Sequence, residues 1–396
     1  LKQAKLLAGK YHAVVSNPPY MNKFSKEMKK FIQENYNEYK SDLFAVFMYR
    51  NFGFCKAGGF SAFMSPFVWM FIKSYESLRA YILKYKSITT LIQMEYSAFE
   101  EATVPICTFV LRNAPIHYTG NYLRLSDFKG GMDVQRQKVL EAQETEKCAY
   151  RFSARQDNFE KIPGAPVAYW VSGKAFDVCT NNSSFEENFT TRAGMITGNN
   201  DLFIRLWHEI DYMKMAVLCK NRNEAQASRA KWFPYNKGGD YRKWFGNAEY
   251  VVNWEDDGYS MRNLKNKDGK IPAHAFNLEY IFDENITWSS LSSYKFSARY
   301  TDYGFLYDAS GSFADVRHEY INYVLSFLCS TVTAYYLSAM NPTLNFQKGN
   351  IAALPFCIEE GKKKLIDNAT KKCIDLSKND WDSFETSWDF KKHPLI

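Results

Sequence analysis

The sequence predicts an α/β fold in two parts, the back half of a doubly wound sheet and a following α+β domain. Over residues 11–112, short apolar runs alternate with amphipathic stretches, which is typical of βαβ units. Only nine residues lie between Met94 and Val104, where one later strand pattern ends and the approach to the next begins, and this is too few for a parallel crossover. Those two strands should therefore be antiparallel neighbours. Beyond residue 188, short aromatic strand patterns with turn residues replace the alternation.

The first element is a short buried strand at residues 11–16, which ends where two prolines offer no N–H to continue a ladder. A helix capped by Ser25 should follow, and then an apolar core helix that begins at Ser41 and is stopped by Gly58 and Gly59. Asp42, at the start of that helix, is interpreted as a cap or dipole partner without a chemical role. The remaining elements expected here are a strand at 60–65, a helix at 74–85, and strands at 89–94 and 106–112.

Four regions are expected along the chain. After residue 117 the pattern becomes polar, and residues 133–148 are interpreted as a solvated helix or connector. One continuous helix at 320–340 should close the aromatic region. The predicted boundaries are 1–117 for the sheet domain, 118–187 for a partly helical connector, 188–360 for the second domain and 361–396 for a helical tail.

Composition excludes several classes of protein. Of 396 residues, 46% are hydrophobic and 23% charged, which describes an ordinary globular chain. The longest apolar run, at residues 60–72, is too short to span a bilayer, so no membrane partner is expected. The 8 cysteines form no C-x-x-C pair and the 6 histidines have no ligand spacing, which predicts a reduced, metal-free, cytoplasmic protein. Because the chain starts with Leu1 and enters a core strand at once, we expect it to be a piece of a longer protein.

The strand at 11–16 runs into the sequence Asn17-Pro18-Pro19-Tyr20. At the carboxyl edge of an open sheet, where such folds place their sites, the Asn17 side-chain oxygen and the Pro18 carbonyl could both accept from one exocyclic NH2. The lone pair of that amine would then point at an electrophile, and Tyr20 would stack on the ring that carries it. The plainer interpretations are a structural turn or a proline-rich peptide ligand.

These segments resemble the N6-adenine DNA methyltransferases, whose signature loop is Asn/Asp/Ser-Pro-Pro-Tyr/Phe. The likeness extends to residues 40–66 and 98–112 and is greatest for the PglX-type enzymes of BREX phage-defence systems, supported by "SNPPYM", "ITGNNDLFIRLW" and "NPTLNFQKGNIAALP". It implies the back half of a class I methyltransferase sheet and catalysis by Asn17, Pro18, Pro19 and Tyr20. It also implies that Phe99 forms the second face of the base pocket, although Phe99 could instead be an ordinary core aromatic of a hairpin.

The resemblance also implies S-adenosylmethionine as cofactor, with Asn17 beside it. In that family the glycine-rich cofactor loop precedes the Asn-Pro-Pro-Tyr strand, so it should lie upstream of this chain, and the chain alone is expected to be inactive. The stretch at 307–315, "YDASGSFAD", looks like such a loop but lacks a parallel-sheet context. We interpret it as a turn.

Residues 220–247 carry seven Lys or Arg against two acidic residues, interleaved with aromatic residues. This composition suits phosphate contact and base-edge reading, although a solvated face over core aromatics is the plain alternative. The family resemblance favours a target recognition domain that binds double-stranded DNA, with possible further partners among phage-defence proteins. The candidate DNA-binding residues are Arg192, Thr197, Asn199, Asn200, Arg205, Lys237, Arg242, Lys243 and Arg299.

Two other functions remain open at this point. The chain could be a non-catalytic DNA-binding specificity module whose sheet docks partner proteins in a defence complex. It could also belong to a fused restriction-methylation enzyme, which would need a nuclease segment that these residues do not show.

Overall fold

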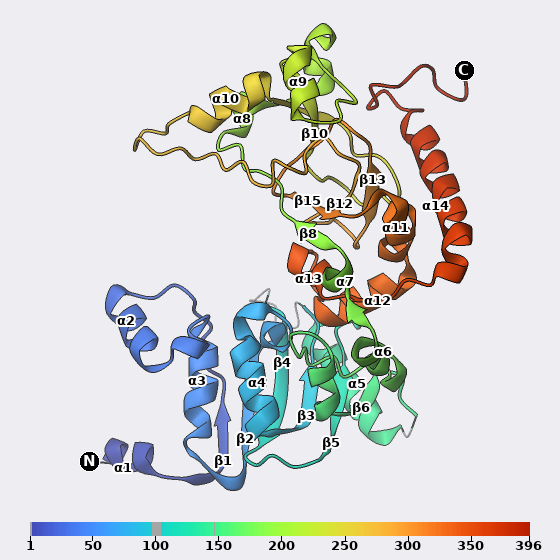
Figure 1. The fold of residues 1–396 in the computed structure, drawn as a ribbon. Helices are drawn as coiled ribbons and strands as arrows, with labels where there is room; N and C mark the ends of the chain where they lie inside the picture. The colour runs from blue at the N-terminus through green and yellow to red at the C-terminus, as the bar shows by residue number, and fades with distance from the viewer. Residues whose placement is uncertain (1, 97–103, 146) are drawn as a thin grey trace. The chain divides into compact units, whose positions relative to one another are not determined.

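The computed structural model describes residues 2–96, 104–145 and 147–396, and the chain divides into two compact units, Leu1–Asn181 and Asn182–Ile396 (Figure 1). The first unit is a mixed sheet with helices, and the second is built from short strands and helices. The structure therefore confirms the predicted fold class, a chain of mixed helices and strands in two parts.

The first unit is built on one six-stranded sheet with the order β1-β2-β4-β3-β5-β6. The pairs β1–β2 and β3–β5 are parallel, whereas β4 is antiparallel to both of its neighbours. Its elements are α1 (Lys2–Ala8), β1 (Tyr11–Ser16), α2 (Lys26–Asn35), α3 (Leu43–Phe52), β2 (Cys55–Pro66), α4 (Glu76–Tyr85), β3 (Ser87–Gln93), β4 (Ile106–Arg112), β5 (Thr119–Arg124), α5 (Gly131–Glu144), β6 (Arg151–Arg155) and α6 (Gly173–Asn181).

Several local expectations are confirmed. The first strand has the predicted bounds, and the Ser25 hydroxyl caps α2 by accepting from the Met28 N–H. Strands β3 and β4 are antiparallel neighbours, as expected from the sequence. Asp42 caps α3, and its carboxylate accepts from the Phe44 N–H at 3.2 Å.

The helix that begins near Ser41 ends earlier than expected. It stops at Gly53, and β2 is already under way at Cys55, so Gly58 and Gly59 lie inside the strand and do not terminate the helix. Gly58 has φ +71°, a conformation that glycine adopts without steric cost, and the register with β1 shifts nearby. A Cβ at Gly59 would lie 2.7 Å from the His12 carbonyl oxygen, so the close approach of β1 requires glycine there.

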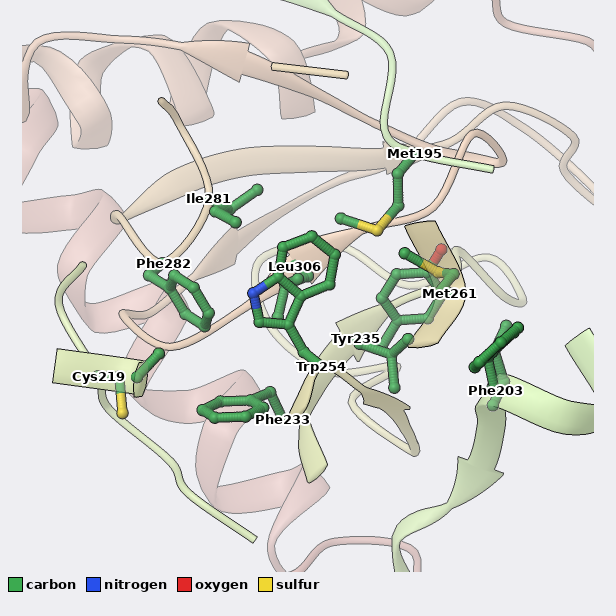
Figure 2. Packing of buried hydrophobic residues seen from close by; sticks show 13 residues of the cluster. Met195, Phe203, Cys219, Phe233, Tyr235, Trp254, Met261, Ile281, Phe282 and Leu306 are labelled. Atoms are coloured by element: carbon green, nitrogen blue, oxygen red, sulfur yellow. The ribbon is translucent and has the colours of Figure 1, made fainter. Parts of the chain in front are cut away.

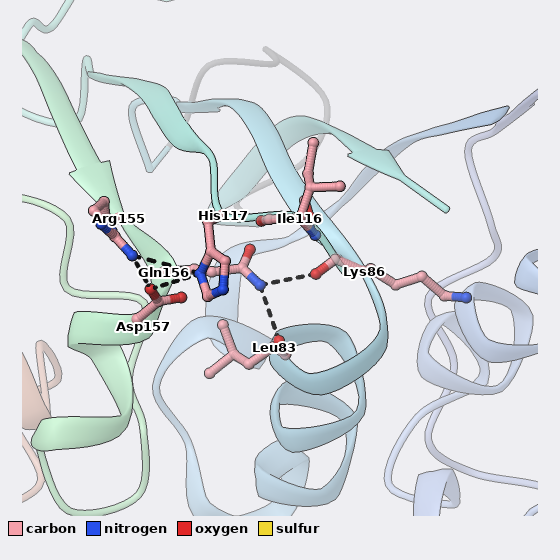
Figure 3. A network of polar contacts seen from close by, with 8 residues as sticks. Leu83, Lys86, Ile116, His117, Arg155, Gln156 and Asp157 are labelled. Carbon is pink, nitrogen blue, oxygen red and sulfur yellow. Dashed lines mark hydrogen bonds and ion pairs between the residues drawn. The ribbon is translucent and has the colours of Figure 1, made fainter. Parts of the chain in front are cut away.

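The boundary expected at residue 117 falls inside the first unit. Strands β5 and β6 continue the sheet beyond β3, and α5 covers most of the stretch read as a solvated helix. Figure 3 shows one reason for the continuity: the Gln156 side chain donates to the carbonyls of Leu83 and Lys86. The same side chain also accepts from the Ile88 N–H. Buried polar groups need such partners, so residues on both sides of 117 share one core. Most of the residues expected as a connector, 118–187, therefore belong to the first unit, which ends at Asn181.

The second unit contains two four-stranded sheets, β14-β10-β11-β9 and β13-β12-β15-β8, and the short pair β16-β7. Its elements are β7 (Ser183–Ser184), α7 (Phe185–Asn188), β8 (Thr190–Arg192), α8 (Asn200–Phe203), β9 (Ile204–Leu206), α9 (Arg222–Ser228), β10 (Trp232–Asn236), β11 (Tyr250–Asn253), α10 (Glu255–Asn263), β12 (Asn285–Ser289), β13 (Ala298–Thr301), β14 (Leu306–Tyr307), β15 (Gly311–Asp315), α11 (Ile321–Cys329), α12 (Thr331–Met340), α13 (Lys348–Ala352), β16 (Pro355–Phe356) and α14 (Glu360–Trp381).

Aromatic side chains form a main core of this unit. Figure 2 shows Trp254, Phe233 and Phe282 packed with Met195 and Leu306, and all five side chains are buried. This core accounts for two of the aromatic residues that the sequence placed among basic ones, Phe233 and Tyr235. The "YDASGSFAD" stretch is β14, a turn and β15, which confirms it as a turn.

The helix expected at 320–340 is two helices. Ser330 ends α11 and caps α12 by accepting from the Thr333 N–H, so the apolar pattern continues while the backbone changes direction. Among the described residues, no single helix is long and apolar enough to cross a membrane; only residues 318–329 and 331–340 together meet that length and composition, with a 62° bend between them.

Candidate active site at the end of the first strand

The Asn-Pro-Pro-Tyr loop begins where β1 ends. Ser16 is in parallel register with Phe63 of β2, so the loop leaves the sheet at the carboxyl edge of both strands. Pro18 is buried and anchors the loop, whereas Asn17 and Tyr20 are exposed. The polar and aromatic groups that the sequence singled out therefore lie together at an accessible edge of the sheet.

The Asn17 amide and the Tyr20 ring are joined by a hydrogen bond. The Tyr20 hydroxyl donates to Asn17 Oδ1 at 3.1 Å, and the Met64 carbonyl oxygen lies 3.4 Å from the same hydroxyl. The ring stands edge-on to Phe44, with a centroid separation of 6.3 Å and an interplanar angle of 87°. Partial burial raises the pKa of Tyr20, with a smaller contribution from Cys107, so the hydroxyl keeps its proton at neutral pH and remains a donor.

Two oxygen acceptors are available to a ligand at this loop. Asn17 Oδ1 keeps a lone pair beyond the one that Tyr20 occupies. In the described part of the chain no hydrogen bond is formed to the Pro18 carbonyl. The arrangement is able to accept two hydrogen bonds from one amino group beside an exposed aromatic ring.

Asp42 ties this loop to the start of α3. Besides capping the helix at the Phe44 N–H, its carboxylate accepts from the Met21 N–H at 3.0 Å. The Leu43 N–H in turn donates to the Met21 carbonyl at 2.9 Å. The sequence predicted the cap but missed this bond back to the loop, because Met21 and Asp42 are far apart in the chain.

One face of the sheet lies open beside Asn17. The other face is packed, with Phe63 of β2 against Phe52 of α3 and against Phe109 of β4. The open face carries a hollow of about 360 Å³, and Val15 on it is 81% exposed. The hollow is lined by Val15, Ser16, Asn17, Ala62, Phe63, Met64, Thr90, Ile92, Thr108, Phe109 and Val110.

This hollow does not fit a complete S-adenosylmethionine site. That cofactor carries a ribose diol, an ammonium and a sulfonium group, which call for carboxylate partners. The lining offers hydroxyl groups and the Asn17 amide but no carboxylate. Asn17, the one cofactor contact expected within this chain, lines the hollow. Phe99, expected as the second face of a base pocket, lies outside the described residues.

Three of the basic residues predicted to bind DNA form contacts within the second unit. Arg192 pairs with Asp315 at 3.2 Å and lies over the Tyr280 ring at 3.6 Å from its centroid. Arg242 forms an ion pair with Asp380 of α14. Lys243 donates to the Cys329 carbonyl oxygen at 2.6 Å. Each cation has an internal partner and is only partly exposed.

Two further candidates are buried, which corrects the sequence expectation for them. Arg299 is fully buried, its Nη2 donates to Ser289 Oγ at 3.2 Å, and its Nε has no partner among the described residues. Burial lowers the pKa of Arg299 to about 10. Thr197 is 2% exposed and donates to Asn200 Oδ1. In this structure neither side chain reaches a surface where DNA could contact it.

Of the other candidates, two are exposed, and Arg205 and Lys237 are partly exposed. Asn199 caps α8 by accepting from the Leu202 N–H, and both Asn199 and Asn200 are exposed. Arg205 donates to the Asp201 and Ile204 carbonyls. The Lys237 amine lies 5.1 Å from the centre of the Tyr250 ring.

Among the residues that the structure describes, there is neither a candidate metal site nor a disulfide bond. No group of three or more His, Cys, Asp or Glu side chains there could hold a metal ion. All eight cysteines are free thiols, and burial raises the pKa of Cys107 to about 12.

Comparison with known proteins finds relatives that are described as methylases or methyltransferases. Residues 2–99 match the family described as Eco57I restriction-modification methylase. The whole chain is 38% identical over 407 residues to the adenine-specific methyltransferase PglX of Lacticaseibacillus casei (strain Zhang), covering 33% of that protein. It is 36% identical over 411 residues to the adenine-specific methyltransferase BrxX of Escherichia coli O9:H4 (strain HS), covering 32% of it. The chain thus spans about a third of the length of these relatives.

A solved structure shares the fold over both units. The type IIL restriction-modification enzyme MmeI, solved in complex with DNA, aligns with 97% of this chain and 52% of its own, with a TM-score of 0.57 and 11% identity. At this identity the likeness concerns the fold alone.

Proposed function

The chain is a relative, over its whole length, of the PglX and BrxX adenine-specific methyltransferases, and we propose that it is part of an enzyme that methylates adenine N6 in DNA. The observation that carries this proposal is the loop at the end of β1. There, an amide oxygen and a main-chain carbonyl lie beside an exposed aromatic ring.

In the proposed reaction, these groups hold the adenine amine. Hydrogen bonds from the amine to Asn17 Oδ1 and the Pro18 carbonyl draw its lone pair out of conjugation with the ring. The Tyr20 ring stacks on a base that has left the duplex, and Phe44 supports Tyr20 from the side. S-adenosylmethionine would supply the methyl group in the complete enzyme.

We further propose that the chain is the C-terminal part of a longer protein that completes the cofactor site. It spans about a third of its curated relatives, and the hollow beside Asn17 lacks the carboxylates that the cofactor needs. The strand order around antiparallel β4 supports the back half of a doubly wound sheet. Kinship with PglX and BrxX supports a role in marking self DNA in phage defence.

DNA is the proposed partner of the second unit. MmeI was solved with DNA and has a similar fold over nearly this whole chain, which supports the assignment. Asn199 and Asn200 remain the stronger candidates for contact because they are exposed. Arg205, Lys237, Arg242 and Lys243 are only partly exposed, and Arg205, Arg242 and Lys243 also have hydrogen-bond or ion-pair partners inside the unit.

The test is an Asn17→Ala substitution in the full-length enzyme. Methylation should fall by about a hundredfold or more, as when a group aimed at the transition state is removed. Affinity for DNA should stay nearly unchanged, because this amide does not contact phosphates. Asn17→Asp retains an oxygen acceptor and is the matched control. Full turnover by Asn17→Ala would refute the catalytic assignment, and parallel loss of DNA affinity would make the residue structural.

A further inference from the structure

A loop extends from the second unit immediately after α10. We name residues 264–277 the arm; Figure 1 shows it as the gold-to-orange segment that runs outward beside α10. Its returning strand forms a β-bridge, with hydrogen bonds of 2.9 and 2.8 Å between Ile196 and His274. A Cβ at Gly198 would lie 2.8 Å from the Ala273 nitrogen, so the arm packs closely on the segment that leads into α8.

The tip of the arm is a turn with its own hydrogen bonds. The Asn266 side-chain oxygen accepts from the Asp268 N–H at 3.0 Å and from the Lys270 N–H at 2.9 Å. The Asn266 N–H donates to the Lys270 carbonyl, and Gly269 provides the positive φ that the turn requires. A tip of defined shape loses little conformational freedom when it binds a partner.

Positive charge is concentrated at this tip. Lys265, Lys267 and Lys270 are exposed, and Asp268 is the one acidic residue between Leu264 and Asn277. In the described residues none of the three lysines has an ion-pair partner, in contrast to Arg242 with Asp380. Clustered cations without partners attract a polyanion.

Exposed apolar and aromatic groups flank these lysines. Phe276 is 48% exposed and stacks on the His274 ring, with centroids 5.6 Å apart and planes 10° apart. Ile196, Leu202 and Ile271 are also exposed. The exposed amides Asn199 and Asn200 lie on the segment that the arm packs against. A row of cations beside flat apolar and amide groups fits the phosphates and groove of a DNA duplex.

We propose that the arm binds double-stranded DNA, with Lys265, Lys267 and Lys270 on the backbone phosphates and Phe276 facing the groove together with Asn199 and Asn200. The inference rests on the proposed function and adds to it the surface that holds the substrate. It also moves the main contact away from the basic stretch at 220–247, which the sequence favoured and in which Arg242 and Lys243 have partners inside the unit.

The test measures binding of this whole chain to a duplex by fluorescence anisotropy over a range of salt concentrations. The arm variant combines Lys265→Gln, Lys267→Gln and Lys270→Gln. The matched control makes the same charge change at three exposed lysines of α14, as Lys364→Gln, Lys371→Gln and Lys372→Gln. All six side chains are at the surface, so circular dichroism should show both variants folded.

The arm variant should flatten the slope of log affinity against log salt by about 0.9 per lost phosphate contact, hence about 2.7 for three, while the control changes it little. Phe276→Ala should weaken binding with the slope unchanged. Equal changes in the two triple variants would overturn the arm assignment and leave DNA as the partner. A wild-type chain without salt-dependent affinity for duplex DNA would overturn the DNA partner of the proposed function as well.

Discussion

At the scale of single residues, Tyr20 has two contacts that hold it in place. Its hydroxyl bonds to Asn17 Oδ1, and its ring rests edge-on against Phe44 of α3. The same side chain therefore orients the amide that would accept the adenine amine and offers the face on which the base would stack. These two roles can be separated by mutation.

Tyr20→Ala should weaken capture of an extruded adenine by ~1–3 kcal/mol, the usual worth of a base stacked on an aromatic ring. Tyr20→Phe retains the ring, so capture should be nearly normal, while turnover falls because Asn17 loses the bond that orients it. Fluorescence of 2-aminopurine at the target position of a duplex, with the full-length enzyme, measures capture. Equal extrusion by wild type and Tyr20→Ala would exclude Tyr20 as the stacking residue.

The sequence predicted the residues of this loop but not how they bond to one another. The motif singles out Asn17 and Tyr20, whereas the bond between them depends on the course of the loop after Pro18. For the basic residues, the sequence reveals even less about which partners they contact. Arg242 finds Asp380 and Lys243 finds Cys329, partners many residues away, so a composition count could not separate an internal cation from one that faces a ligand.

At the scale of elements, the same residue types serve different ends. Gly58 and Gly59 resemble a helix stop, but here they allow β2 to bend and to approach β1. Ser330 lies within an apolar helical pattern and nevertheless begins a new helix. Both cases depend on where the neighbouring element lies, which local periodicity does not encode.

The start of α3 gives a prediction at this scale, because Asp42 holds both the helix and the Asn-Pro-Pro-Tyr loop. Asp42→Ala removes the acceptor for the Phe44 and Met21 N–H groups and should cost about 0.5–2 kcal/mol of local stability. Asp42→Asn keeps an oxygen acceptor and should retain most of it. Hydrogen exchange of residues 20–45 in this chain measures the effect. Equal loss of protection in both variants would mean that the charge of Asp42, and not its hydrogen bonds, stabilises the segment.

At the scale of the whole molecule, the second unit has wider bounds than the sequence suggested. The pair β16–β7 joins residues 183–184 to 355–356, and the ion pair of Arg242 with Asp380 fastens α14 to the unit. The expected tail at 361–396 is therefore part of the same body. These contacts join segments with no shared pattern, which explains why the predicted boundaries at 187 and 360 were too narrow.

These wider bounds determine how the division of labour between the units should be tested. The loop at Asn17 would hold one adenine that has left the duplex, so it has no access to the neighbouring base pairs, and those must be recognised through their groove edges elsewhere. In the full-length enzyme, exchange of residues 182–396 for the equivalent region of a relative should change which adenines are methylated and keep turnover. A narrower exchange of residues 188–355 cuts through β16, because it replaces Pro355 but leaves Phe356 and β7, so it should give less folded protein. Mapping N6-methyladenine in a genome that carries each chimera measures the outcome. An unchanged target sequence with the wider exchange would place recognition outside this unit.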